Sequence, residues 1–365
     1  MASFLGKSEL SGIWKERFQD VSKLNEYTQK GLKVELGDVI IKDYKLSAAI
    51  FNNASFRDVE WTNTITEKLS FTNTVFRNNT FSNVEFTNAK FTNVTFEDSE
   101  FYGTSFYLSQ MTGVKFIHCK FMKKSDFVQL KDSTIEFEYT TFESNGTNFE
   151  GTSFAKSKAA LIFRDSTLTD LSLTDFIFPS SLTFENSKLQ DIDMDRSKLA
   201  KLVMDNVTGG GQSGCNDGSI AEVEIRNSEM SFGLNDGTYG KIHFVNSKIN
   251  STFNNAHIKE LKLSNCKGMA SLGLYQSPID SLQISNCPIN NFRPIEATIQ
   301  NLRIDNSSIE NSKLKKMKVV NFTLTDVSLD GQLDFSNAQV ENLITKNITQ
   351  KSGLNLNLTG SNVKF

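Results

Sequence analysis

The chain contains little proline, histidine, cysteine or tryptophan. Among 365 residues there are 4 prolines, 3 histidines, 4 cysteines and 2 tryptophans. The cysteines, at positions 119, 215, 266 and 287, form no CxxC pair, so neither a zinc ribbon nor a disulfide-rich secreted domain is indicated. The histidines lie far apart in the sequence, whereas a metal site needs converging ligands. We therefore expect no metal and no cofactor.

A strong net charge and long apolar runs are also missing. The formal net charge is −3, without the basic footprint of a nucleic-acid-binding protein. No stretch approaches the ~18 consecutive apolar residues of a spanning helix. The beginning, MASFLGKSELSGIWKERF, lacks the apolar run of a signal peptide. We expect a protein with no membrane span and no direct nucleic-acid binding, either cytoplasmic or exported without a signal peptide.

Phenylalanine, in contrast, is abundant and recurs with a step of five. Neither a helix nor a flat strand keeps one face with that step. The same register begins with Phe51, Phe56 and Trp61 and has one polar gap, at Thr66. The regular part of this core ladder consists of Phe71, Phe76, Phe81, Phe86, Phe91, Phe96, Phe101, Phe106, Phe116 and Phe121, with Met111 in the same register.

Small turn-forming residues accompany the rings. Two positions after many rings stand Asn53, Asp58, Asn73, Asn78, Asn83, Asn88, Asn93, Asp98, Gly103 and Gly113. Asn, Asp and Gly tolerate the backbone angles of sharp corners. Five residues therefore form one side of a square with its ring inside, and four sides form a coil of about 20 residues that stacks at the ~4.8 Å strand spacing. The predicted fold is an all-β solenoid.

The second half of the chain keeps this period without the phenylalanines. Asn or Asp recurs at positions 165, 186, 206, 227, 246, 265, 286, 306, 326 and 347, in steps of 19 to 21 residues. We therefore predict one solenoid over residues 48–365, regular to about residue 155 and degenerate afterwards.

The N-terminal residues 1–47 differ from the repeats. Trp14, Phe18 and Val21 recur at helical spacing, with Ser8 or Ser11 as the candidate cap residue. We predict one amphipathic helix over residues 8–30 that covers the first coil, then a short strand or hairpin within residues 34–46. At the other end, LNLNLTGSNVKF still has the coil pattern, so we expect a second copy (a homodimer through the C-terminal coil), a partner or further sequence to cover it.

These units resemble the pentapeptide-repeat family, well over residues 48–155 and loosely over 156–365. The resemblance implies a right-handed quadrilateral β-helix. The Trp-bearing helix followed by NNASFRDVEW is also similar to the start of the β-helix in HECT-like bacterial effector ubiquitin ligases, although no catalytic lobe is recognisable. Other members of the family are DNA-mimicking topoisomerase inhibitors.

We interpret the protein as a non-enzymatic protein-binding scaffold, bacterial and effector-like, whose partner is another protein. The alternative is a DNA mimic that binds and protects gyrase, which requires a continuous acidic stripe. We identify no catalytic residues: the acids are scattered, and Asp191, Asp193 and Asp195 fit a solvated outer face better than the paired carboxylates of a glycosidase.

A few other residues are candidates for special roles. Cys119, Cys266 and Cys287 occupy small inward positions and are predicted to be core thiols, with a disulfide between the last two as the alternative. Cys215 lies in the glycine-rich segment 208–218, predicted to be a corner loop or bulge. The candidate interaction patch is Lys313, Lys315, Lys316 and Lys318.

Overall fold

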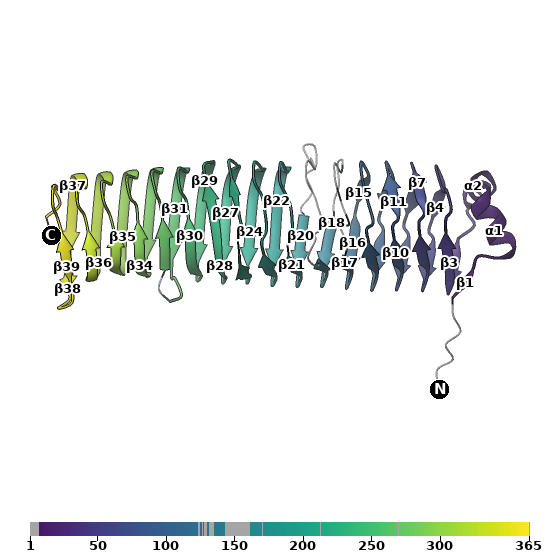
Figure 1. Ribbon diagram of the computed structural model, residues 1–365, viewed down its shortest axis with the longest axis horizontal. Helices are drawn as coiled ribbons and strands as arrows, with labels where there is room; N and C mark the ends of the chain where they lie inside the picture. Colours follow the sequence, from purple (N-terminus) through teal and green to yellow (C-terminus); the bar gives the residue numbers. More distant parts are fainter. Residues whose placement is uncertain are drawn as a thin grey trace, which may run out of the picture. The chain divides into compact units, whose positions relative to one another are not determined.

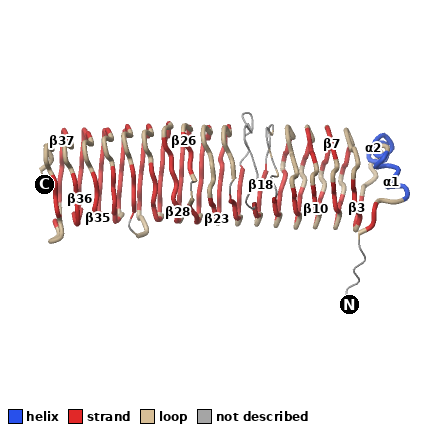
Figure 2. Tube along the Cα trace, in the orientation of Figure 1, coloured by secondary structure: helices blue, strands red, loops and turns tan. Residues whose placement is uncertain are grey.

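The computed structural model describes residues 7–122, 125, 127, 130, 135–142, 161–169, 171–211, 213–268 and 270–364. The predicted limit of the regular repeats, near residue 155, lies outside these residues. The chain forms two compact units, Met1–Lys188 and Leu189–Phe365. Each unit is built of stacked parallel strands (Figures 1 and 2).

The first unit begins with two helices, α1 (Gly12–Gln19) and α2 (Val21–Gln29). Its strands are β1 (Ser8–Glu9), β2 (Glu35–Gly37), β3 (Val39–Lys42), β4 (Ile50–Asn52), β5 (Ser55–Arg57), β6 (Glu60–Thr62), β7 (Ile65–Glu67), β8 (Ser70–Thr72), β9 (Val75–Arg77), β10 (Thr80–Ser82), β11 (Glu85–Thr87), β12 (Lys90–Thr92), β13 (Thr95–Glu97), β14 (Glu100–Tyr102), β15 (Gln110–Thr112), β16 (Val114–Ile117), β17 (Lys120–Met122), β18 (Ile135–Glu138), β19 (Thr141–Phe142), β20 (Leu161–Arg164), β21 (Thr167–Thr169) and β22 (Ile177–Glu185).

Strand β23 (Lys188–Gln190) spans the boundary between the units. The second unit contains β24 (Lys198–Asp205), β25 (Thr208–Gly210), β26 (Gly214–Asn216), β27 (Ser219–Arg226), β28 (Glu229–Asn235), β29 (Thr238–Val245), β30 (Lys248–Thr252), β31 (His257–Ser264), β32 (Ala270–Gly273), β33 (Pro278–Ser285), β34 (Pro288–Arg293), β35 (Thr298–Lys313), β36 (Lys318–Asp334), β37 (Gln339–Lys346), β38 (Thr349–Gln350) and β39 (Asn355–Asn357).

Four columns of parallel strands form the sides of the first unit. One column is β4–β8–β12–β15, and a second runs β2–β5–β9–β13–β16–β18–β20–β22. The third runs β1–β3–β6–β10–β14–β17–β19–β21, and the fourth contains β7 and β11. Residues 20 apart are paired, as Phe71 is with Phe91. The predicted solenoid with a four-sided coil is therefore confirmed.

The phenylalanines of the first unit fill its interior. Every ring of the ladder from Phe71 to Phe121 is at most 1% exposed. Rings one coil apart stack in parallel: Phe96 lies 4.7 Å from Phe76 and 4.8 Å from Phe116, with interplanar angles of 8° and 5°. Rings on adjacent sides meet edge to face, as Phe96 and Phe101 do at 73°. Each ring therefore has both favourable aromatic geometries at once.

The corner residues adopt the left-handed backbone conformation that the sequence predicts. In the first unit all ten of the predicted corner residues have positive φ, between 48° and 65°. The ten Asn and Asp positions of the degenerate repeats also have positive φ, between 44° and 55°. Asparagines at successive corners also bond to one another: Asn73 Nδ2 donates to Asn53 Oδ1 at 3.3 Å, and Asn93 Nδ2 to Asn73 Oδ1 at 3.2 Å. Asparagine thus suits both the positive φ of the corner and the hydrogen bonding between corners of successive coils.

One pair of core residues departs from the repeat and could not be recognised beforehand. Trp61 is fully buried, and its indole nitrogen donates to Oδ1 of the buried Asn79 at 3.3 Å. The Asn79 amide nitrogen donates in turn to the carbonyls of Phe56 (2.8 Å) and Arg77 (2.9 Å). The buried indole N–H therefore has a hydrogen-bond partner and avoids the cost of an unpaired buried donor.

The N-terminal segment is a pair of helices, so the prediction of one helix is wrong. Asp20 breaks the helical run because its carboxylate accepts hydrogen bonds from the backbone nitrogen and hydroxyl of Ser22, capping α2. Phe18 is buried against Phe51 and Tyr44, with ring centroids 6.0 and 5.9 Å away. Ser11 precedes α1 without a side-chain cap bond.

The solenoid also starts earlier than predicted. Strands β2 and β3 pair in parallel with β5 and β6, so the hairpin alternative for residues 34–46 is wrong. Leu36, Ile41 and Leu46 point inward with the same step of five as the later rings. The predicted boundary at residue 48 therefore falls inside the first coil, because aliphatic residues hold the positions that phenylalanine holds later.

Asparagine side chains form hydrogen bonds with backbone groups of the first and last coils. On α2, Asn25 accepts from the Ile50 nitrogen at 2.8 Å and donates to the Ala48 carbonyl at 3.0 Å. In the second unit, Asn362 makes the same pair of bonds to the nitrogen and the carbonyl of Val340, each 2.8 Å. At each place one asparagine amide thus supplies the hydrogen bonds that a neighbouring strand would otherwise make.

We expect Asn25→Ala to lower the free energy of unfolding of the first coil by about 1–3 kcal/mol, because it leaves a partly buried donor and an acceptor unpaired. Native-state hydrogen exchange at the Ile50 amide measures this effect. The control is Gln29→Ala at the exposed end of α2, which should leave exchange at Ile50 unchanged. Equal exchange in the two variants would contradict the role of Asn25.

The second unit uses longer strands of the same coil. Strands β24, β27, β29, β31, β33, β35, β36 and β37 pair in parallel in one column, in steps of 19 to 21 residues. Aliphatic pairs such as Leu261 and Leu263 on β31 point inward and are fully buried. Residues between and beside them point outward. We call the outward side chains of this column the wide face.

The glycine-rich segment forms a bulge, as predicted. Gly209 pairs with Met230 and Gly214 with Gly233, so two more residues lie between the pairs on this segment than on β28. A Cβ at Gly209, where φ is +148°, would meet the Leu189 carbonyl oxygen at less than contact distance. Cys215 of β26 is fully buried inside the coil.

Candidate interaction surface

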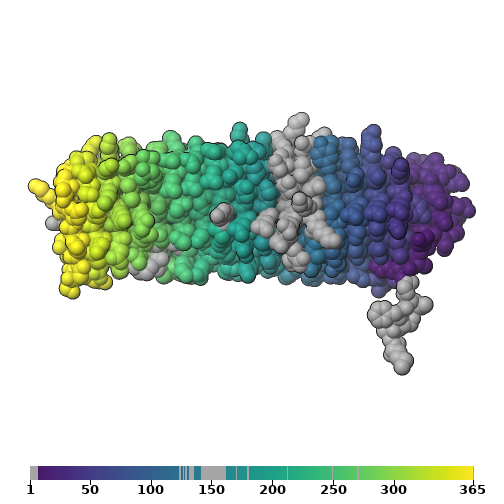
Figure 3. Space-filling view, viewed as in Figure 1, coloured from purple at the N-terminus to yellow at the C-terminus, as the bar shows by residue number. Residues whose placement is uncertain are grey.

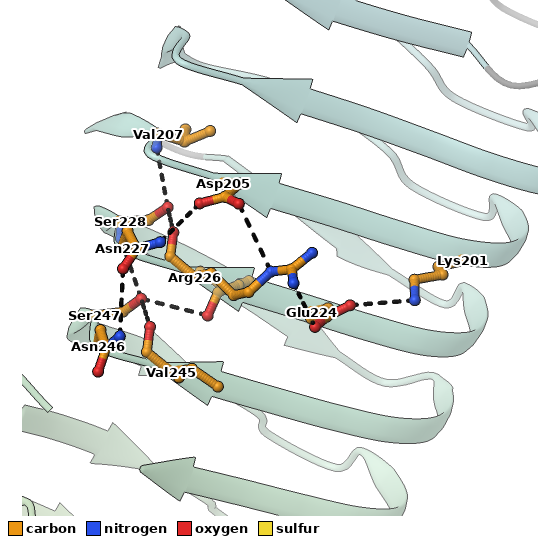
Figure 4. A network of polar contacts seen from close by, with 11 residues as sticks. Lys201, Asp205, Val207, Glu224, Arg226, Asn227, Ser228, Val245, Asn246 and Ser247 are labelled. Atoms are coloured by element: carbon orange, nitrogen blue, oxygen red, sulfur yellow. Dashed lines mark hydrogen bonds and ion pairs between the residues drawn. The ribbon is translucent and has the colours of Figure 1, made fainter. Parts of the chain in front are cut away.

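The wide face of the second unit carries a network of ion pairs between successive strands (Figure 4). Lys201 on β24 lies 2.8 Å from Glu222 and 3.2 Å from Glu224, both on β27. Arg226 lies 3.3 Å from Glu224 and 3.8 Å from Asp205. The strand register fixes these partners because each coil places its side chains one strand spacing from the last.

The pairing stabilises the charged forms of Lys201 and Glu222. The hydrogen bond to Glu222 raises the pKa of Lys201, and the same ammonium group lowers the pKa of Glu222. Lys201 on β24 faces two acids, Glu222 and Glu224, on the next strand of the column. Two bases are therefore held between three acids in one ordered network.

One row of outward side chains on β35, β36 and β37 consists of amides. Asn321 Nδ2 donates to Asn301 Oδ1 at 2.9 Å, and Asn342 Nδ2 donates to Asn321 Oδ1 at 3.1 Å. Each amide is exposed and keeps further hydrogen-bonding capacity on its outer side. The wide face thus carries a row of hydrogen-bonded amides in addition to its ion pairs.

The first unit has a comparable arrangement of charges. Arg164 lies between Glu136 (2.7 Å) and Glu185 (2.9 Å), and these two carboxylates raise its pKa, with Glu185 the larger contributor. Lys115 also reaches Glu136 at 3.0 Å. These charges come from strands β16, β18, β20 and β22 of one column. Along these four strands bases therefore alternate with acids.

The predicted lysine patch is divided by a corner of the chain. Lys313 ends β35 and Lys318 begins β36, and Lys315 and Lys316 lie between them. Lys315 is 3.0 Å from Asp334, and Lys316 is 3.0 Å from Glu296. Two of the four charges are thus neutralised by neighbouring coils, which weakens the patch as an anion site.

The acidic residues near position 193 serve local turns. Asp193 Oδ1 accepts from the Asp195 nitrogen at 2.9 Å, and Asp195 accepts from the backbone and side chain of Asn216 at 2.8 and 2.9 Å. Asp191 occupies a corner with φ of 54°. In the part of the chain that the structure describes, no group of three or more His, Cys, Asp or Glu residues could hold a metal ion.

The bonding of the cysteines differs from the main prediction. Cys266 and Cys287 form a disulfide between successive coils, with Cα atoms 4.7 Å apart, so the prediction of core thiols is wrong for this pair. Successive coils bring equivalent inward positions within the Cα distance that a disulfide requires. At the equivalent small inward positions of other coils, serine hydroxyls link successive coils. Ser307, for example, accepts from the Cys287 nitrogen at 3.1 Å.

Cys119 and Cys215 are buried thiols. Burial raises the pKa of each to about 12, so both are neutral and poor nucleophiles near pH 8. We expect iodoacetamide at pH 8 to label neither residue in the folded protein and to label both after unfolding. Peptide mass spectrometry measures the labelling, and labelling of folded Cys215 comparable to that of the unfolded chain would contradict its inward position.

Together, these observations define a parallel β-solenoid with ordered outer faces. A family model of pentapeptide repeats matches residues 62–93 and 70–106, with eight copies. Residues 62–106 are therefore a run of pentapeptide repeats. None of the helices among the described residues is long and apolar enough to cross a membrane.

Known structures resemble the fold only distantly. The full-length structure of QnrB1, a plasmid-mediated fluoroquinolone resistance protein, is 15% identical, with 55% of this chain and 85% of that chain covered and a TM-score of 0.29. HetL, a pentapeptide-repeat protein involved in heterocyst differentiation in Nostoc sp. strain PCC 7120, is 12% identical, with 92% and 94% covered and a TM-score of 0.19. No curated protein sequence matches the chain. These values carry no argument about function.

Proposed function

We propose that this protein is a non-enzymatic scaffold that binds another protein through the outer faces of its coils. The observation that carries the proposal is the order of those faces: ion pairs and amide ladders between coils hold the outward side chains on a fixed lattice. A partner that meets such a surface loses little binding free energy to ordering it. The wide face is the best candidate because it combines charged and amide segments.

A test of this proposal places a photocrosslinking amino acid at outward positions. His243, Gln283 and Thr323 sample one column of the wide face, and Thr92 on β12 samples a face of the first unit. We expect a saturable crosslink to one protein from one face only. Crosslinks to the same set of proteins from every face, or from none, would contradict specific binding.

The gyrase-binding DNA mimic is the alternative function. Its acids would have to be free to imitate phosphates, whereas Asp205, Glu222 and Glu224 of the wide face each lie 2.8 to 3.8 Å from a base. A gyrase supercoiling assay distinguishes the two functions: we expect no change on adding the protein. Inhibition of supercoiling, or its protection from a fluoroquinolone, would favour the mimic.

The effector-like role is the finer part of the proposal. It rests on the similarity of the N-terminal segment to HECT-like bacterial effectors, and a translocation reporter fused to the chain tests it. Self-association through the C-terminal coil is a separate proposal. Its support is the exposure of Ile344, which is 62% exposed on β37, and sedimentation of wild type against Ile344→Ser measures it.

A further inference from the structure

The two N-terminal helices meet through an aromatic–arginine cluster on their outer side. The rings of Trp14 (α1) and Tyr27 (α2) pack edge to face, with centroids 5.4 Å apart. The Arg17 guanidinium carbon lies 3.8 Å from the Tyr27 ring centroid and 5.0 Å from that of Trp14. Cation–π contacts with both rings hold the guanidinium in place.

Two large apolar side chains flank this cluster and are exposed. Ile13, next to Trp14 on α1, is 57% exposed, and Leu32, just after α2, is 47% exposed. The Tyr27 hydroxyl donates to the Lys33 carbonyl at 3.2 Å, so its ring lies along the segment that carries Leu32. We call Ile13, Trp14, Arg17, Tyr27 and Leu32 the cap patch. The space-filling view shows atoms of α1 and α2 on the outer surface (Figure 3, purple).

The cap patch combines the residue types that dominate binding hot spots. Tryptophan, tyrosine and arginine are enriched there because they offer large contact areas with a fixed polar group. The structure already uses Phe18 and Leu24 to cover the first coil. The exposed side chains of the cap patch are therefore not needed for that task.

The charges around the cap patch favour an anionic partner. Within the described residues Arg17 makes no ion pair, whereas Lys23 pairs with Asp20 at 4.0 Å and Lys30 with Glu26 at 2.6 Å. Residues 7–33 contain six basic and four acidic side chains, a net charge of +2. The planar edge of a stacked guanidinium remains available for a carboxylate.

We propose that the cap patch binds an acidic segment of a partner protein that also carries a large apolar side chain. A carboxylate of the segment pairs with the edge of Arg17, and the apolar side chain packs on Ile13 and Leu32. A nucleic acid or an anionic membrane fits less well because Glu9 and Glu16 accompany the basic groups. This site is separate from the outer faces of the coils, so it does not depend on their function.

Selection from a displayed library of random short peptides, using the full chain as target, tests the proposal. We expect the selected peptides to be enriched in Asp or Glu together with Leu, Phe or Trp. Arg17→Gln should weaken their binding by roughly ten- to a hundredfold, since a charge-assisted hydrogen bond contributes about that much. Arg17→Lys should restore only part of it, because lysine lacks the planar edge.

The matched control is Lys30→Gln, which removes one positive charge just after α2 at an ion-paired position; we expect binding within about twofold of wild type. Ile13→Ser removes exposed apolar area without touching the core, and should weaken binding even if Arg17→Gln fails to fold. Circular dichroism monitors folding of every variant. Peptides without acidic enrichment, or binding that neither Arg17→Gln nor Ile13→Ser reduces, would overturn the proposal, as would preferential binding of RNA or anionic vesicles.

Discussion

Phe96→Ala is expected to lower the free energy of unfolding by about 3–5 kcal/mol. The Phe96 ring stacks on Phe76 and Phe116 and meets Phe81 and Phe101 edge to face. Removing it leaves a cavity that the neighbouring coils cannot fill, because hydrogen bonds between the strands fix their spacing. The loss includes both buried area and aromatic contacts.

Urea unfolding followed by circular dichroism measures the Phe96 variant. The control is Thr95→Ala, one residue earlier and pointing outward, which should change stability by less than about 0.5 kcal/mol. Phe96→Leu should lie between the two because it keeps part of the buried volume. A cost for Thr95→Ala equal to that for Phe96→Ala would show that the side chains are not divided into inner and outer sets.

Loss of the Cys266–Cys287 disulfide is the other large expected effect. The two residues are 21 apart, and closing a loop of that length in the unfolded chain is worth about 3 kcal/mol on the chain-entropy account. The double variant Cys266→Ser/Cys287→Ser should lose about that much stability. Serine already occupies the equivalent inward positions of other coils, as Ser228 and Ser247 do. The loss of stability therefore measures the crosslink and not poor packing of the serines.

Reducing agent provides the comparison for the disulfide. Dithiothreitol should lower the unfolding midpoint of the wild type and leave the double variant unchanged. Cys119→Ser, which removes a buried thiol outside the disulfide, should keep the wild-type response to dithiothreitol. A wild-type midpoint that is insensitive to dithiothreitol under unfolding conditions would contradict the presence of the crosslink.

The fold was largely predictable because the repeat restricts each residue in the same way. A ring every five residues predicts the interior, and Asn or Asp two positions later predicts the left-handed corner; Phe91 and Asn93 are one such pair. The first coil was missed because Leu36 and Ile41 fill its interior in place of phenylalanine. Aliphatic residues are common in most sequences, so their step of five does not stand out. The break at Asp20 depends on a local capping bond that helical periodicity does not reveal.

The candidate surfaces were much less predictable. Partners across coils depend on small changes of step between 19 and 21 residues, so the contacts of Lys201 with Glu222 and Glu224 required the strand register. The cap patch depends on how α1 packs against α2. Trp14 was predicted as part of the lid, but it packs on Tyr27 instead, which the helical spacing alone cannot distinguish.

Cysteine crosslinking across one coil tests the central claim most directly. The account places Thr72 and Thr92 side by side on β8 and β12, pointing outward, at a strand spacing of about 4.8 Å that a disulfide can bridge. Thr72→Cys/Thr92→Cys should therefore crosslink readily under mild oxidation, whereas Thr72→Cys/Thr87→Cys, with its second cysteine on β11 of another side, should not. Efficient crosslinking of the second pair and not of the first would contradict a coil of twenty residues with four sides.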